Sequence, residues 1–130
     1  MTDDIERLAP AGLAPPGGHY SHAVRHGALV ITSGQLGVRA DGTHTADLPF
    51  EDQARQALTN MLTALATADA GAGDILKVTA YIVGVEHWPR FNAVYREIMG
   101  DARPARTVVP VPELHYGYLV EVDAMAVVRS

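Results

Sequence analysis

The clearest pattern in the chain is a run of apolar residues at helical spacing in its middle third. Between Phe50 and Ala68, apolar residues at 50, 54, 57, 58, 61, 62, 65 and 68 form one stripe. Spacing of three and four residues predicts an amphipathic helix that buries one stripe. The glycines of "DAGAGD", which follows, are typical of a helix end.

A second helix is predicted over residues 86–100, "EHWPRFNAVYREIMG". Pro89 suits its first turn, where the missing N–H of a proline has no helical partner to lose. The apolar positions again fall on one face, which consists of Phe91, Val94, Tyr95, Ile98 and Met99. Both helices are therefore expected to pack on something apolar.

Short runs rich in β-branched residues predict the strands. Residues 75–85 indicate one strand, and residues 19–27 and 28–38 indicate a hairpin that turns at His26-Gly27. Residues 104–127 predict two more strands, which are adjacent and joined by a turn. Residues 1–18, rich in proline, alanine and glycine, predict an irregular lead-in. The expected order is β-β-α-β-α-β-β.

The economical packing for this order is an α+β sheet covered on one face by the two helices. The other face would then be exposed in a single chain, although the strands carry apolar residues on both alternations. These residues are Leu29, Val30, Ile31, Val83, Val85, Val120, Val122 and Val127. We therefore expect an oligomer. No repeat or linker divides the chain, so residues 1–130 are expected to form one domain.

Composition narrows the class of protein further. The chain has 130 residues, is 48% hydrophobic and carries a net charge of -5, which argues against a broad phosphate-binding surface. No apolar run is long enough to span a bilayer, and the acidic N-terminus lacks a signal core. The absence of cysteine removes thiolate chemistry and fits a reducing compartment. We expect a cytoplasmic protein with no nucleic-acid or membrane partner.

Two charged residues stand out among the last two predicted strands. Arg106 offers a planar guanidinium suited to a carboxylate, although an exposed charge at a strand start is the plainer interpretation. Glu121 lies in the apolar run "YLVEVDAMAVV". It either faces solvent or is half-buried near a subunit boundary, in which case its pKa would rise and suit proton transfer.

The remaining candidates give weaker signals. Ser33 has no sequence partner that marks it as a nucleophile, and Ser-Gly after a strand usually forms a turn; Gly34 could let a backbone N–H approach a ligand. The histidines lack metal-binding spacing, so no metal is expected. No glycine-rich nucleotide motif is present. The aromatic residues are expected in the core or an interface rather than in a base-stacking platform.

Taken together, the motifs resemble those of the Rid family (reactive intermediate deaminase, also called YjgF/YER057c/UK114 and including RutC-like proteins). The motifs follow the family's order over nearly the whole chain. They are "GHYSHAV" (18–24), "TSGQLG" (32–37), "EDQARQALTNML" (51–62), "WPRFNAVY" (88–95), "PAR" (104–106) and "VEVDAMA" (120–126). Each is short, but the set is specific.

This resemblance implies a chorismate-mutase-like fold with a mixed sheet, a homotrimer, and ligand clefts between subunits. It also implies hydrolysis of enamines and imines, such as 2-aminoacrylate and 2-iminopropanoate, to 2-oxo acids and ammonia without a cofactor. A non-catalytic binding protein, an RNase and a deaminase of a different pathway-specific substrate are the alternatives. The RNase fits poorly with an acidic chain that has no paired catalytic histidines.

The resemblance also assigns roles to individual residues. Arg106 would hold the substrate carboxylate, and Glu121 would position or activate the attacking water. Tyr20 and Ser33 would line the pocket and help with orientation or proton transfer. The rest of the cleft would include Gly34, Asn92 and Val108.

The chain departs from the family pattern near the expected cleft. His19 and His22 replace a proline and a glutamine, Val108 stands where a cysteine is common, and His115 replaces a proline. These changes bear on substrate identity more than on reaction type. His115 and its neighbour Tyr116 either contact a ligand or pack at an interface.

Overall fold

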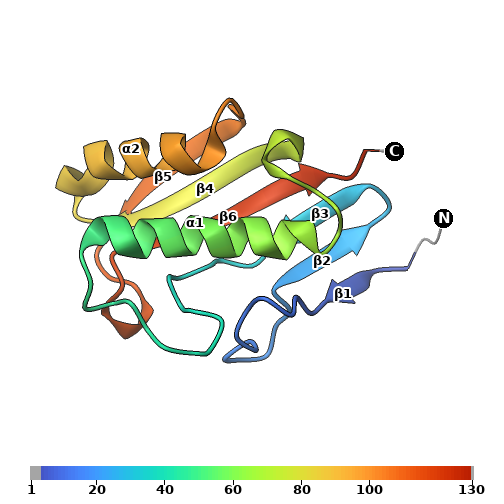
Figure 1. Cartoon of the computed structure of the whole chain (residues 1–130), viewed down its shortest axis with the longest axis horizontal. Helices are drawn as coiled ribbons and strands as arrows, with labels where there is room; N and C mark the ends of the chain where they lie inside the picture. The colour runs from blue at the N-terminus through green and yellow to red at the C-terminus, as the bar shows by residue number, and fades with distance from the viewer. Residues whose placement is uncertain (1–3, 130) are drawn as a thin grey trace.

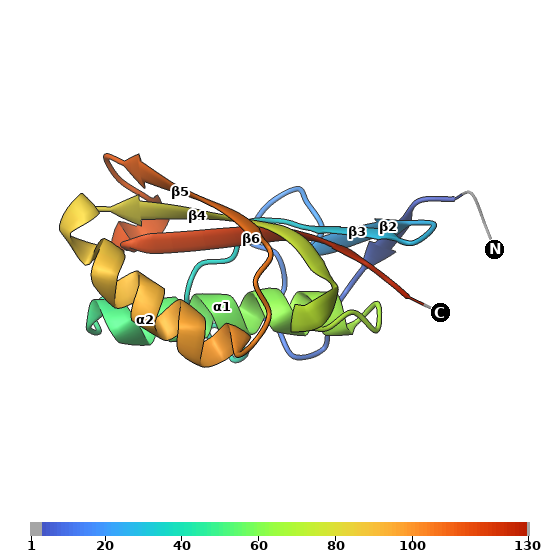
Figure 2. The same ribbon diagram turned by 90° about the horizontal axis from the view of Figure 1, so that it is seen from above.

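A computed structural model describes residues 4–129 as one six-stranded mixed sheet with two helices on one side (Figures 1 and 2). The strand order is β1-β2-β3-β6-β4-β5. Strands β4 and β5 are parallel, and every other neighbouring pair is antiparallel. The strands are β1 (Glu6–Leu8), β2 (Ala23–His26), β3 (Leu29–Thr32), β4 (Ile75–Val83), β5 (Ala105–Val111) and β6 (Val120–Val127). The predicted α+β class is confirmed.

Both predicted helices form close to their expected bounds. Helix α1 (Phe50–Ala66) buries the predicted stripe, and helix α2 (Trp88–Met99) starts after a 3₁₀ turn at Val85–His87. Other 3₁₀ turns lie at Ala72–Asp74 and His115–Gly117. The two helices pack against the buried alternation of β6 and β4, so the core lies between the helices and the sheet. No helix of the described residues is long and apolar enough to cross a membrane.

Two features of the predicted strand arrangement are wrong. The lead-in 1–18 is not wholly irregular, because Glu6–Leu8 pairs with β2; its residues 1–3 lie outside the described part of the chain. Strands β5 and β6 are not adjacent in the sheet, because β4 lies between them and pairs with both. The helix α2 between β4 and β5 acts as the crossover that lets these two strands run parallel.

The two faces of the sheet differ in cover. On β6, the side chains of Val120, Val122, Ala124 and Ala126 are buried beneath the helices, while the alternate positions face away. On that open face Ile31 lies beside Met125, and the two are about 40% exposed. No described helix covers this apolar surface (Figure 2). Burial of it in an oligomer remains a prediction.

Candidate active site

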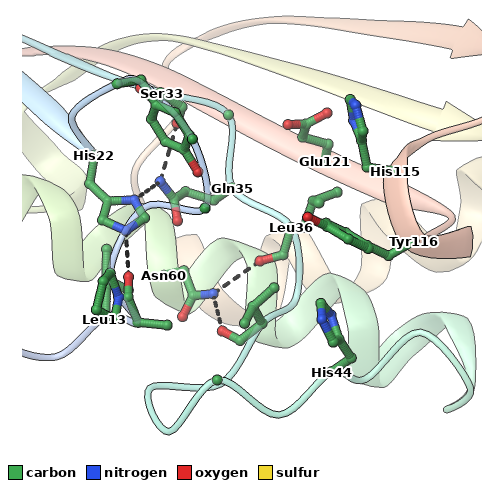
Figure 3. A pocket seen from close by; sticks show the side chains of 18 residues that line it. Leu13, His22, Ser33, Gln35, Leu36, His44, Asn60, His115, Tyr116 and Glu121 are labelled. Carbon is green, nitrogen blue, oxygen red and sulfur yellow. Dashed lines mark hydrogen bonds between the residues drawn. The ribbon is translucent and has the colours of Figure 1, made fainter.

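A cavity of about 690 Å³ opens on the chain beside the end of β3 (Figure 3). Three loop segments form its wall: residues 13–22, residues 33–44, and the turn that contains His115 and Tyr116. Strand β6 contributes Glu121. Of the residues predicted to form the site, this cavity brings together Tyr20, Ser33, Gly34, His115 and Glu121.

The segment after β3 is held against β6 by backbone pairing. Gln35 donates its N–H to the carbonyl of Val122 at 2.7 Å, and Val122 donates back to Gln35 at 3.1 Å. This bridge places Gly34 directly against the Glu121 carboxyl group. A Cβ atom at position 34 would lie 2.9 Å from Glu121 Cδ and nearer still to its Oε2. A residue larger than glycine at position 34 would therefore push the Glu121 carboxylate out of its place.

The environment of Glu121 favours its neutral form more than water does. Partial burial raises the pKa of the Glu121 carboxyl group, the positive charge of His115 lowers it, and nearby Asp123 raises it. Figure 3 shows the His115 ring beside this carboxyl group. A half-buried carboxyl group with a raised pKa is better suited than an exposed one to accepting and returning a proton.

Ser33 and Tyr20 lie on the opposite wall of the cavity. The Ser33 hydroxyl donates to the carbonyl of Ser21 at 2.5 Å, so its proton is directed at the backbone. This leaves the Ser33 oxygen as an acceptor and gives it no base that would make it a nucleophile. Tyr20 is 50% exposed, and its ring meets His22 edge-on. Both residues line the cavity.

His22, which replaces the usual glutamine, has a structural role in the cavity wall. Its Nε2 lies 2.7 Å from the carbonyl of Ala14, and its Nδ1 lies 3.1 Å from Nε2 of Gln35. The amide of Gln35 can only donate from that nitrogen, so Nδ1 of His22 accepts this bond and Nε2 is left to donate to the Ala14 carbonyl. The ring thus fastens the segment around Ala14 to the loop after β3.

Polar side chains of helix α1 position the far side of the cavity. Asn60 is buried and donates to the carbonyls of Leu36 at 3.0 Å and Val38 at 2.7 Å. Gln53 is also buried and donates to the carbonyls of Ala46 and Leu48. These two residues hold the loop that carries His44 against the helix. Neither residue belongs to the predicted site, although a polar residue within a buried helical stripe is a signal that could have revealed it.

An aromatic group forms the end of the cavity away from Ser33. The His44 ring lies 4.8 Å from the Tyr116 ring and 5.7 Å from the Tyr118 ring, measured between centroids. Tyr116 adopts φ 60° and ψ 17°, a left-handed conformation that costs a non-glycine residue about 1 kcal/mol or more. His44 was absent from the predicted site because nothing in its local sequence marks it.

Arg106, Asn92 and Val108 lie elsewhere. On β5, Arg106 and Val108 pair with Val78 and Ala80, whose side chains face the helices. The guanidinium accordingly stacks over the Tyr95 ring at 4.7 Å and donates to Asn92 Oδ1 at 3.1 Å, both on α2. Among residues 4–129, no carboxylate lies within ion-pair distance of Arg106.

The predicted site residues therefore form two separate groups in one chain. Glu121 on β6 lies opposite Tyr81 of β4 and faces the open side of the sheet. Arg106 lies on the edge strand β5 and faces α2. The cavity is lined by Glu121 and not by Arg106 of the same chain. Within the described residues there is also no group of three or more potential metal ligands.

Comparison with known proteins identifies the class to which this fold and cavity belong. The sequence model of the family described as Endoribonuclease L-PSP matches residues 11–128. The chain belongs to this family, which is the Rid/YjgF family indicated by its motifs.

Particular relatives align over almost their whole length. The chain is 35% identical over 125 residues to 2-iminobutanoate/2-iminopropanoate deaminase of Dermatophagoides farinae, covering 95% of this chain and 98% of that protein. The crystal structure of the E. coli YjgF gene product has a TM-score of 0.90 at 30% identity, over 95% of this chain and 99% of that one. The structure of E. coli TdcF with bound serine has a TM-score of 0.84 at 30% identity, over 95% and 97%.

Proposed function

We propose that this protein is a hydrolytic deaminase that converts reactive 2-imino and 2-enamino acids to 2-oxo acids and ammonia. The observation that carries the proposal is the division of the site into two groups with complementary chemistry. One group offers a proton-accepting carboxyl group in a cavity, Glu121, and the other offers an oriented guanidinium with no acidic partner among residues 4–129, Arg106. An imino acid needs both.

The proposal includes a homotrimer with its sites between subunits. A symmetric ring of three chains makes head-to-tail contacts, so the edge strand β5 of one chain can meet the open sheet face of the next. Such contact would bury the exposed apolar residues of that face. It would also bring Arg106, Asn92 and Val108 of one subunit to the Glu121 cavity of its neighbour.

The chemistry requires few groups. Arg106 binds the substrate carboxylate through its planar fork, helped by Asn92, while Tyr20, Ser33 and the backbone at Gly34 orient the imine. Ionised Glu121 takes a proton from water as the water oxygen bonds to the imine carbon and the C=N π bond breaks, and it returns this proton to the nitrogen. Glu121 then takes the hydroxyl proton of the resulting carbinolamine and delivers it to the nitrogen as the C–N bond breaks. This step releases ammonia and a 2-oxo acid and leaves Glu121 ionised.

The relatives support this direction. The mite protein is named as a deaminase of 2-iminobutanoate and 2-iminopropanoate, and TdcF was crystallised with serine, which has the carboxylate and α-nitrogen of such a substrate. No cofactor is required, because the imine carbon is already electrophilic. The family description also names an endoribonuclease, but the net charge of -5 is unfavourable for RNA binding.

The direct test measures ammonia and 2-oxo acid release from imines that an amino-acid oxidase generates in the same solution. We expect the protein to accelerate release from alanine-derived and 2-aminobutanoate-derived imines. Binding of these acids without any acceleration would instead identify a non-catalytic binding protein. RNA cleavage that persists through stringent repurification, with no effect on imines, would contradict the proposal outright.

A substitution at Gly34 tests whether the position of Glu121 matters. In Gly34→Ala the new methyl group would displace the Glu121 carboxyl group, so we expect kcat to fall about 100-fold. The unfolding temperature should change little, because the displaced atoms end a flexible side chain. Gly73→Ala is the matched control, since a Cβ there meets nothing nearer than 3.9 Å. Equal activity in the two variants would remove the role assigned to this contact.

The charge of His115 should be visible in the pH dependence. Falling pH protonates Glu121, so the rate of imine hydrolysis should drop as the pH falls below the pKa of this carboxyl group. Burial raises this pKa and His115 lowers it. His115→Gln removes the lowering charge and should move the acid limb of the kcat/KM profile to higher pH. His26→Gln, at an exposed turn, should leave it in place. A shift of the limb to lower pH in His115→Gln would contradict the lowering of the Glu121 pKa by His115.

A further inference from the structure

We propose that His44, Tyr116 and His115 form a subsite that receives an aromatic side chain of the imino acid. The inference rests on the proposed function and names the substrate class of the same site. It follows from the shape and chemistry of the cavity beyond Glu121. A three-carbon imino acid would leave most of this space unfilled, because cavities of about 300–1000 Å³ hold much larger ligands.

The three rings form a continuous wall that starts at the reacting carboxyl group. His115 lies beside Glu121, and Tyr116 follows it with a centroid distance of 6.2 Å (Figure 3). His44 comes next, at 4.8 Å from Tyr116 and with the ring planes tilted by 40°. If the imine carbon of a substrate lies at Glu121, the side chain of that substrate therefore lies along the faces and edges of these three rings.

His44 is held in one orientation by groups beneath it. The Tyr118 hydroxyl is buried and accepts the backbone N–H of Thr45 at 3.1 Å, and it lies 2.9 Å from His44 Nδ1. The hydroxyl proton is satisfied only if it is donated to that nitrogen. The contact with Tyr118 fixes the His44 ring at the cavity, where its face and edge are available to an aromatic group.

Tyr116 is held over the cavity by a backbone conformation that few non-glycine residues adopt. With φ 60° and ψ 17°, its ring leaves the turn toward the segment around Gly17. A Cβ at Gly17 would lie 3.9 Å from the Tyr116 hydroxyl, so the tyrosine spans the space between the two walls. Strained residues of this kind concentrate at functional sites, where the position of the side chain is needed.

The remaining lining favours a flat apolar group. Leu13, Leu36 and Val38 line the cavity with the three rings, and of the described residues Glu121 is the only carboxylate that does so, with no lysine or arginine. Offset and edge-to-face ring contacts favour an aromatic side chain over an aliphatic one of equal size. The subsite thus predicts that imines derived from phenylalanine-like amino acids are preferred over the imine derived from alanine.

Two measurements test the subsite separately from the reaction. Calorimetry compares the binding of phenylpyruvate, pyruvate and 4-methyl-2-oxopentanoate, which are stable product analogues with aromatic, small and aliphatic side chains. Turnover is measured in parallel on the imines of phenylalanine, alanine and leucine. Tyr116→Gly removes the ring and suits the positive φ, so folding is preserved, and Tyr116→Phe keeps the ring. His26→Ala is the exposed control.

We expect wild type to bind phenylpyruvate about tenfold more tightly than either other acid, and to show the same preference in kcat/KM. Tyr116→Gly and His44→Ala should remove this preference, while Tyr116→Phe and His26→Ala retain it. Equal binding of the three acids, or a preference that survives Tyr116→Gly, would overturn the subsite. Selective binding of phenylpyruvate with no turnover of any imine would support the subsite and refute the deaminase.

Discussion

Replacing Arg106 by alanine is expected to lower kcat/KM for imine hydrolysis by about 1000-fold. The guanidinium is held by the Tyr95 ring and the Asn92 carbonyl, and within residues 4–129 it has no acidic partner. It is thus prepared for a carboxylate that comes with the substrate. The variant loses the anchor that places the imine carbon near the attacking water, so both binding and orientation suffer. The measurement is steady-state kinetics with oxidase-generated imines.

Two further variants separate this role from a general effect of charge. Arg96→Ala removes an exposed arginine from the same end of the chain and should leave the rate unchanged. Arg106→Lys keeps the positive charge but loses the planar fork, so it should recover only part of the activity. The oligomeric state of Arg106→Ala should match that of wild type in size-exclusion chromatography with light scattering. Wild-type activity in Arg106→Ala would remove the carboxylate-binding role.

Much of the fold was predictable because its helices and strands have strong local patterns. The apolar stripe that starts at Phe50 and the proline near the start of α2 predicted both helices within a few residues. The β-branched run beginning at Ile75 predicted β4. In each case the same residues that define the pattern are those that the structure buries, so local and tertiary preferences agree.

Strand order was less accessible because it depends on contacts between distant segments. Strands β5 and β6 follow one another in the chain, and sequential strands often pair, yet β4 lies between them. That error matters for the site. Two adjacent strands would place Arg106 and Glu121 close together, whereas the observed register puts them on opposite faces. The pattern of one strand does not show which strand is its neighbour.

The candidate site was predicted in part for similar reasons. Motifs shared with the family located Ser33, Gly34 and Glu121, which the structure gathers at the cavity. His44 reaches the cavity only because Asn60 and Gln53 hold its loop against α1, through contacts to backbone carbonyls. Such contacts depend on the folded path of the loop and leave no spacing rule in the sequence. They were therefore missed.

Replacing Glu121 by glutamine is expected to lower kcat by about 1000-fold, the contribution of a well-placed general base. Glutamine keeps the size of the side chain and its place against Gly34 but cannot accept the proton from water. Because burial raises the pKa of Glu121 in the folded chain, ionisation of this group opposes folding above its unfolded pKa. The variant should therefore unfold at no lower temperature than wild type at pH 8, which circular dichroism can check. A loss of activity with a loss of folding would not fit this role.

Mixing the two inactive variants then tests where each residue acts. In a ring of three chains, a site that takes Glu121 from one subunit and Arg106 from the next is intact when an Arg106→Ala chain precedes a Glu121→Gln chain. Random reassembly of equal amounts after denaturation should make about one quarter of the sites intact, and activity should return to about that fraction of wild type. Reassembly of each variant alone gives the baseline. If both residues came from the same chain, every site in the mixture would lack one of them. No recovery from a mixture that mass spectrometry shows to contain hybrid trimers would thus refute the site between subunits, even if each residue is essential.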